Sequence, residues 1–273
     1  MRRKALGREL RKLRSDAGES LEQIAKLLGC STGKVGHFET GRNAPSKPEL
    51  MVLLGHYGIS EQDQPVFEEI RQEASKRGWW STYRLPHWFS NYVGMETDAL
   101  RVRNFELEVI PGLLQTEEYA RAVTELARHM TEPDEVGRKV ELRMARQERL
   151  FEEQPLELVA LISEAALRRC AQVEHVAAKQ LNHLLKMGER PNVEIQVLPF
   201  DVGLHASLSG SFLVLDFPPE TWPPTAYQEY AVGGHLIDDQ EVVADLDTLF
   251  GELREMALSE RDSARMISKF ARK

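Results

Sequence analysis

Apolar side chains recur every three to four residues along the first 77 residues, and this spacing predicts five short helices. The first spans residues 4–17, and the next two lie within residues 20–41, joined by a tight turn. The fourth begins at residues 46–48, and the fifth runs from near residue 61 to residue 76. The side chains predicted to be buried are Leu6, Leu10, Leu13, Ala17, Leu21, Ile24, Ala25, Leu28, Val35, Phe38, Leu50, Leu53, Leu54, Tyr57, Phe67 and Ile70.

The two middle helices carry recognisable capping residues. Ser20 and Gln23 have the spacing of a capping box, and Ser31 is placed to cap the following helix. Gly29 and Gly41 stand where the two helices end, as expected for residues that close a helix in a left-handed conformation. Two short helices in this arrangement form a helix-turn-helix, whose second helix enters the major groove of DNA. The pattern therefore predicts double-stranded DNA as a partner.

The same segment carries a specific order of residues: Leu13-Arg14, Gly18, Ala25, Leu28-Gly29, Ser31, Lys34-Val35, Glu39-Thr40-Gly41-Arg42 and Pro45. In this pattern it resembles the phage-repressor and Cro-like helix-turn-helix proteins, the xenobiotic-response-element family. Many members of that family open the first motif helix with a Gln that contacts a phosphate. Leu21 occupies this place here, so that contact is not expected.

Four positions of the second motif helix are predicted to face the groove, opposite the buried Val35 and Phe38: Thr32, Gly33, Gly36 and His37. Thr32 and His37 are the candidates for base contacts, because threonine reaches a thymine methyl and histidine donates to guanine. Glu39 is predicted to be structural, since a carboxylate beside phosphate is repelled. The predicted phosphate contacts are Lys34, Arg42, Asn43 and either Arg11 or Arg14.

Gly33 and Gly36 are unusual at these positions, because each glycine inside a helix costs about 1 kcal/mol relative to alanine. One interpretation is that the bare backbone approaches the base edges closely. The other is sequence drift in a weak DNA binder. Both remain open at this point.

The charge of the chain is divided unequally. Residues 1–47 hold eleven Lys or Arg against five Asp or Glu, whereas the remaining residues hold twenty-four against thirty-eight, and the net charge is −8. A basic segment followed by an acidic body is typical of a protein that meets phosphate at one end.

Beyond residue 95 the pattern predicts helices first and a mixture of strands and helices later. Aromatic residues crowd segment 78–95, which predicts a linker pinned to a neighbouring domain. The predicted helices are 96–105, 116–129 (capped by Thr116), 134–151, 173–187, 241–256 and 260–271; the predicted strands are 156–162, 193–200, 211–217, 227–232 and 235–237, the last two as a hairpin around Gly233-Gly234.

We therefore expect a mainly α protein with an α/β part. Its first domain, residues 1–77, is a five-helix helix-turn-helix domain. The linker at 78–95 leads to a C-terminal regulatory or dimerisation domain over residues 96–273, helical over 96–154 and α/β over 155–273.

The second region contains its own series of short motifs: Pro111-Gly112-Leu113-Leu114-Gln115-Thr116, Tyr119-Ala120-Arg121, Arg143, Arg146-Gln147-Glu148-Arg149-Leu150, Glu164-Ala165-Ala166-Leu167-Arg168, Val197-Leu198-Pro199-Phe200 and Gly210-Ser211-Phe212. It resembles the uncharacterised domain that follows such helix-turn-helix domains in many actinomycete regulators. The resemblance implies transcriptional control, sometimes with a small partner protein.

Four residues of this region are candidates for an effector pocket: Arg143, Arg146, Glu164 and His205. Ordinary helix ion pairs with nearby glutamates are the alternative interpretation of the arginines. His205 lacks the lysine two residues later that a phospholipase-D-like site requires, and no histidines stand at metal-ligand spacing. We therefore expect neither enzymatic activity nor a metal or cofactor.

No stretch approaches 18 apolar residues, the first residues lack the apolar segment of a signal peptide, and Cys30 and Cys170 are far apart. A cytoplasmic protein with reduced thiols is expected. The predicted function is a sequence-specific, homodimeric transcriptional regulator. The alternative is an antitoxin-like or adaptor protein that binds a small partner protein and regulates its own operon.

Overall fold

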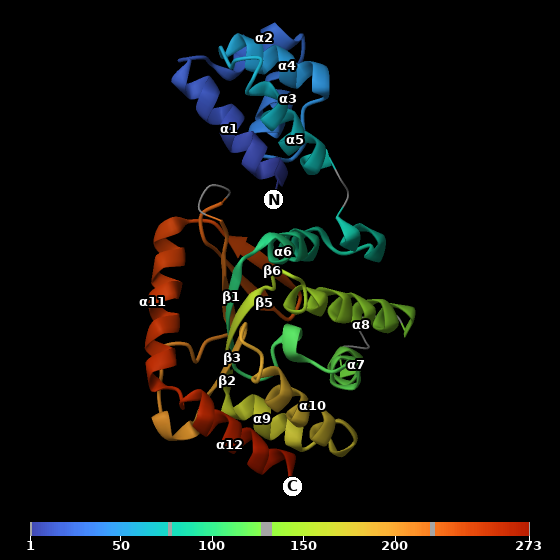
Figure 1. Cartoon of the computed structure of the whole chain (residues 1–273), viewed down its shortest axis with the longest axis vertical. Helices are drawn as coiled ribbons and strands as arrows, with labels where there is room; N and C mark the ends of the chain where they lie inside the picture. The colour runs from blue at the N-terminus through green and yellow to red at the C-terminus, as the bar shows by residue number, and fades with distance from the viewer. Residues whose placement is uncertain (1, 76–77, 127–132, 219–221, 273) are drawn as a thin grey trace. The chain divides into compact units, whose positions relative to one another are not determined.

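The computed structural model describes residues 2–75, 78–126, 133–218 and 222–272 (Figure 1). The chain separates into two compact units, residues 1–79 and 80–273. Each unit has its own hydrophobic core, so each is described by itself.

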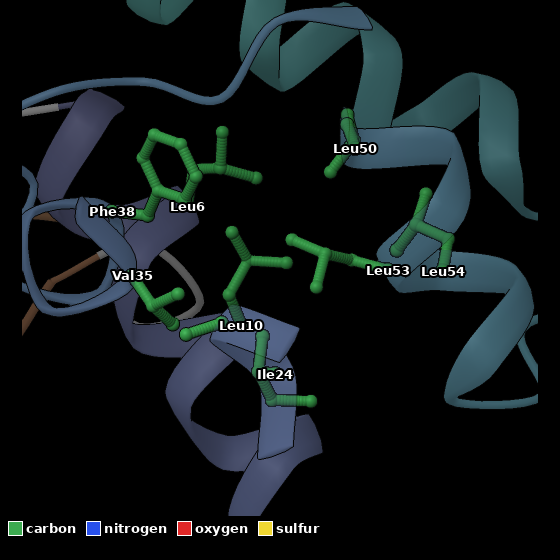
Figure 2. Close-up of a cluster of buried hydrophobic side chains, with 9 residues drawn as sticks. Leu6, Leu10, Ile24, Val35, Phe38, Leu50, Leu53 and Leu54 are labelled. Carbon is green, nitrogen blue, oxygen red and sulfur yellow. The ribbon is translucent and has the colours of Figure 1, made fainter. Parts of the chain in front are cut away.

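The first unit contains the five predicted helices: α1 (Arg2–Asp16), α2 (Leu21–Leu28), α3 (Thr32–Glu39), α4 (Lys47–His56) and α5 (Gln64–Ser75). Their apolar sides meet in a core in which Leu6, Ile24 and Leu50 are at most 1% exposed (Figure 2). Burial of Ala17 was predicted wrongly: α1 ends one residue earlier, and Ala17 is exposed in the turn that follows.

The predicted caps of the two motif helices are confirmed. Ser20 and Gln23 form a reciprocal capping box at the start of α2, and Gly29 ends that helix with φ of 63°. The Ser31 hydroxyl accepts a hydrogen bond from the Lys34 amide at the start of α3. Gly41 has φ of 67°, a conformation that glycine adopts without the steric cost paid by other residues.

The described residues of the second unit form one six-stranded sheet with the order β3-β2-β1-β4-β5-β6. Strands β1, β2 and β3 run parallel to one another, and the remaining pairs are antiparallel. The strands are β1 (Arg101–Glu106), β2 (Glu157–Ser163), β3 (Val193–Leu198), β4 (Phe212–Asp216), β5 (Thr225–Tyr230) and β6 (Gly233–Ile237).

Strand β1 replaces the helix predicted over residues 96–105, and that prediction was wrong. Residues up to Asp98 belong to α6 (His87–Asp98), and the chain then enters the centre of the sheet. Asn104 and Glu106 alternate with Arg103 and Phe105, so successive side chains point to opposite faces of the sheet. A segment of six residues has little conformational preference of its own, so its hydrogen bonds to β2 and β4 make it a strand rather than a helix.

Helices cover both faces of this sheet (Figure 1). Helix α11 (Gln240–Met256) packs Val243, Phe250 and Leu253 against Phe105 on one face, while α6 and α8 lie on the other. The further helices are α7 (Glu117–Leu126), α8 (Pro133–Gln147), α9 (Glu164–Ala171), α10 (Glu174–Met187) and α12 (Glu260–Ala271), with short 3-10 turns η1 (Trp79–Tyr83), η2 (Gly112–Leu114), η3 (Glu148–Leu150) and η4 (Phe200–Val202). The predicted extension of α7 to residue 129 lies outside the described residues.

The predicted hairpin exists, but its turn was placed wrongly. Tyr230 pairs with Gly233, so the two-residue turn is Ala231-Val232 and both glycines belong to β6. Gly234 lies against the ring of Tyr227, and a Cβ atom there would overlap the Tyr227 hydroxyl. The glycines are therefore needed for close packing within the sheet.

Candidate DNA interface and the C-terminal polar network

Helix α3 is fixed by its inward face. Val35 and Phe38 are each 2% exposed in the core of the first unit, which turns the opposite side of the helix outward. On that side Thr32 and Gly33 are exposed, while Gly36 and His37 are half-buried.

The C-terminal end of α3 gathers three of the predicted DNA-binding residues. The His37 Nε2 atom lies 3.5 Å from Nη1 of Arg42, and the His37 carbonyl accepts a hydrogen bond from the Asn43 amide at 3.1 Å. Thr40 donates its hydroxyl to the Gly36 carbonyl at 2.8 Å, which closes the helix end. His37, Arg42 and Asn43 therefore form one polar group.

Lys34 is held by the helix that follows. Its Nζ atom lies 2.5 Å from Oε1 of Glu49, and the other carboxylate oxygen of Glu49 accepts hydrogen bonds from Ser46. The hydrogen bond to Glu49 raises the pKa of Lys34. Together with Asn43, Lys34 and Glu49 line a hollow of about 490 Å³. Lys34 is exposed, so its ammonium group is accessible from solvent.

The two arginines predicted on α1 differ in their surroundings. Arg14 donates two hydrogen bonds to the Glu39 carboxylate, at 2.5 and 2.9 Å, and a third to the Glu19 carbonyl at 2.7 Å. The bond to Glu39 raises the pKa of Arg14. This bidentate pair ties α1 to the end of α3. Arg11, in contrast, is exposed.

In the second unit, Arg146 forms the centre of a buried polar cluster. Its guanidinium donates to both carboxylate oxygens of Glu96, at 2.6 and 2.7 Å, and to the Tyr92 hydroxyl at 2.9 Å. The Arg146 and Glu96 side chains are 7% and 2% exposed. Burial alone would lower the pKa of Arg146, but the Glu96 carboxylate raises it above its ordinary value. The Tyr92 ring also stacks on Tyr227, with centroids 4.1 Å apart.

A second polar group adjoins this cluster at the end of β1. Burial raises the pKa of Glu106 to about 7, against the opposing hydrogen bonds from Ser211 and Asn104. Glu229 raises this pKa further, and Arg143 lowers it. Arg143 donates to the Gln115 side chain at 3.0 Å, and its own pKa is lowered by burial and by Arg146.

The four residues predicted as an effector pocket make separate contacts. Glu164 accepts hydrogen bonds from Arg168 and from the Phe200 amide, while the His205 ring packs edge-on against Phe105. Of the four, only Arg143 and Arg146 are close enough to influence one another, since Arg146 lowers the pKa of Arg143. Among the described residues, no hydrogen bond, ion pair or ring contact joins either arginine to Glu164 or His205.

Sequence reasoning missed Tyr92, Glu96 and Glu106, the partners of these arginines. Glu106 gave no clear signal, because Val102 shares its face of β1 while Arg103 shares the face of Phe105, so polar and apolar residues do not alternate along the segment. The pairing of Glu96 with Arg146 had no signal either, because fifty residues separate them.

A groove of about 680 Å³ runs between α10 and α12. It is lined by the apolar Leu184 and Ile195, by Arg261, Arg265 and Lys269 of α12, and by Arg272, which follows that helix. Within the described part of the chain, no group of three or more His, Cys, Asp or Glu residues is placed to hold a metal ion. Nor does any described helix have the length and apolar character needed to cross a membrane.

Two family models match the chain. One, described as a helix-turn-helix domain, matches residues 5–66, which include α2 and α3. The other, described as a domain of unknown function (DUF5753), matches residues 89–269, from within α6 into α12. No curated protein and no solved structure matches the chain.

Proposed function

Because the chain belongs to the DUF5753 family and carries a helix-turn-helix domain, which indicates DNA binding, we propose that it is a sequence-specific transcriptional regulator. In this proposal residues 1–77 read DNA, and the part from residue 96 onward serves dimerisation or regulation. Residues 80–95, predicted as a linker, belong to the second unit, in which Tyr92 and Val93 of α6 are buried. One recognition helix covers only a half-site, so the regulator acts as a homodimer in the cytoplasm.

The observation that carries this proposal is the outward face of α3. The core holds Val35 and Phe38, and the Arg14–Glu39 pair fixes the end of the helix. The opposite side, where Thr32 and Gly33 are exposed, is the one proposed to enter the major groove. Thr32 and His37 are the proposed base contacts. Arg14 is engaged with Glu39 and its side chain is only 15% exposed, so Arg11 is the proposed phosphate contact of α1. Lys34, whose side chain is 45% exposed beside Glu49, is a second proposed phosphate contact, together with Arg42 and Asn43.

Substitution of His37 and Lys34 tests this assignment on a duplex selected from a random-sequence pool by the full-length protein. His37→Ala is expected to relax the preference at one base pair, by about 1–3 kcal/mol of discrimination. Lys34→Ala is expected to weaken all sequences alike and to reduce the slope of log K against log salt by about 0.9. Lys186→Ala, an exposed position on α10, is the control and changes neither quantity. The reverse pattern for His37 and Lys34 would overturn the assignment.

One observation favours the second candidate function, binding of a small partner protein. The segment joining β3 to β4 exposes large apolar side chains: Phe200 is 53%, Leu204 86% and Leu208 54% exposed. Contiguous exposed apolar patches mark protein contact sites, and in this proposal the three side chains form such a patch. Leu204→Asn with Leu208→Asn should abolish co-purification with the product of a small neighbouring reading frame and leave DNA affinity unchanged. Undiminished co-purification would contradict this role of the segment.

A further inference from the structure

Gly33 and Gly36 have no structural reason within their own unit to be glycine. Neither has a positive φ, in contrast to Gly29 and Gly41. A Cβ atom at Gly33 would meet nothing closer than the Ser31 hydroxyl at 4.0 Å, and one at Gly36 would meet nothing within 4 Å. The backbone and the packing of the described residues would both accept alanine at either position.

Gly7 on α1 shows what a packing requirement looks like in this unit. A Cβ atom at Gly7 would overlap the carbonyl oxygens of Phe38 and Glu39, so α1 and the end of α3 can meet only if this residue is glycine. No comparable neighbour stands beside Gly33 or Gly36. Since glycine disfavours helix formation, two glycines in the eight residues of α3 weaken the helix without any return from intramolecular packing.

Both glycines lie on the outward face, beside Thr32 and His37. Their Cα atoms leave a shallow, side-chain-free strip on a helix whose other exposed positions carry polar groups. The family match places this helix within a helix-turn-helix domain, which indicates that the molecule contacting this strip is a DNA duplex.

We propose that Gly33 and Gly36 set the depth at which α3 enters the major groove, and are specificity-determining residues of the DNA interface. With no side chain at these positions, the helix backbone approaches the base edges, and the short Thr32 side chain reaches them. A methyl group at Gly36 would hold the helix away from the bases. This inference rests on the proposed function.

The test compares Gly33→Ala and Gly36→Ala with Gly55→Ala, all in the full-length protein. Gly55 is the matched control because it is exposed on α4 of the same unit and a Cβ atom there would also meet nothing within 4 Å. All three variants are expected to keep or raise the thermal midpoint, because alanine favours the helix. Gly36→Ala is expected to lower affinity for the selected duplex about tenfold or more, with an unchanged salt slope. Gly55→Ala should remain within about twofold of the wild type.

The outcomes separate this inference from the function beneath it. A wild-type protein that shows no salt-dependent binding to any duplex overturns the proposed function. If the wild type binds and the Gly33 and Gly36 variants bind equally well, only the inference fails. An equal loss of affinity in Gly55→Ala also overturns it, because helix stiffening would then be the cause. Hydrogen exchange over residues 31–40 checks that α3 is formed; a less protected α3 in Gly36→Ala would show that the glycine is needed for folding and likewise overturns the inference.

Discussion

Arg146 connects two helices of the second unit through a charge pair that is almost completely buried. Its partner Glu96 keeps one further hydrogen bond, from Tyr92 at 2.5 Å. Removing one member of a buried pair is costly because the remaining charge stays desolvated, whereas an exposed pair contributes little.

Arg146→Met is therefore expected to lower the free energy of unfolding by about 3–5 kcal/mol, measured by urea titration of the full chain. The double variant Glu96→Gln/Arg146→Met should recover part of this loss, since no unpaired charge then remains. Arg101→Met is the control: Arg101 and Glu157 are about half exposed, and their loss should cost less than about 1 kcal/mol. Equal losses in the two arginine variants would refute the structural role of the Glu96–Arg146 pair.

Glu106 makes the stability of the second unit depend on pH. Its folded pKa of about 7 lies above the unfolded value of 4.5, so between these values the folded state binds more protons than the unfolded state. Stability from this group is present below pH 4.5 and is lost as the pH rises through 7. Glu106→Gln should therefore raise stability by less than about 1 kcal/mol at pH 5 and by about 3 kcal/mol at pH 8.

The measurement is the difference in urea unfolding between variant and wild type at pH 5, 6.5 and 8. Taking the difference removes the opposite contributions of His183 and His205, whose pKa values are lowered by burial. Glu108→Gln is the control, because Glu108 is exposed two residues further along the same segment. A pH-independent difference for Glu106→Gln would contradict the raised pKa.

The residues whose positions were predictable are those determined by local chemistry. Ser20, Gln23, Ser31 and Gly29 have roles set by backbone groups a few residues away, so their spacing alone identified them. Arg146 illustrates the opposite case. Its long side chain has several carboxylates within reach along the sequence, and only the packing of α6 on α8 selects Glu96.

Among the elements, the long periodic ones were predictable and β1 was not. Helices α11 and α12 agree with their predicted bounds within one residue, since each has a continuous apolar stripe. In β1, Asn104 and Glu106 face a polar network supplied by other elements, so the segment lacks the apolar alternation of a half-buried strand. The hairpin turn was misplaced for a related reason: Gly233 and Gly234 are normal turn residues, but Tyr227 and Tyr230 require them within the strand.

The packing of β6 on β5 gives a prediction for the hairpin as an element. Gly234→Ala should lower the free energy of unfolding by about 1–3 kcal/mol, because the added methyl overlaps the Tyr227 side chain. Chemical unfolding of the full chain measures this. Gly210→Ala is the control, since Gly210 has ordinary φ and open space around its Cα. A stabilised Gly234→Ala variant would show that the strand accommodates a side chain and would contradict the close packing.

For the whole molecule, the predicted division of charge matches a division of structure. The first compact unit, residues 1–79, contains the helix-turn-helix and holds fourteen Lys or Arg against eleven Asp or Glu, whereas residues 80–273, which form the sheet and its covering helices, hold twenty-one against thirty-two. The net positive charge thus lies in the unit that carries the helix-turn-helix. An acidic second unit adds repulsion from DNA, so the affinity of a single recognition helix is limited.

The proposed dimer compensates for this limit and predicts a defined operator geometry. Two recognition helices on one side of the duplex require half-sites about 10 base pairs apart, centre to centre. Inserting five base pairs between the half-sites places them on opposite sides and should lower affinity about a hundredfold or more, toward that of one half-site. Inserting ten should restore part of the affinity. Sedimentation velocity of the free protein and of its complex supplies the stoichiometry. A complex with one chain per duplex, whose affinity is unaffected by either insertion, would exclude the dimer. The protein would then bind a single half-site as a monomer.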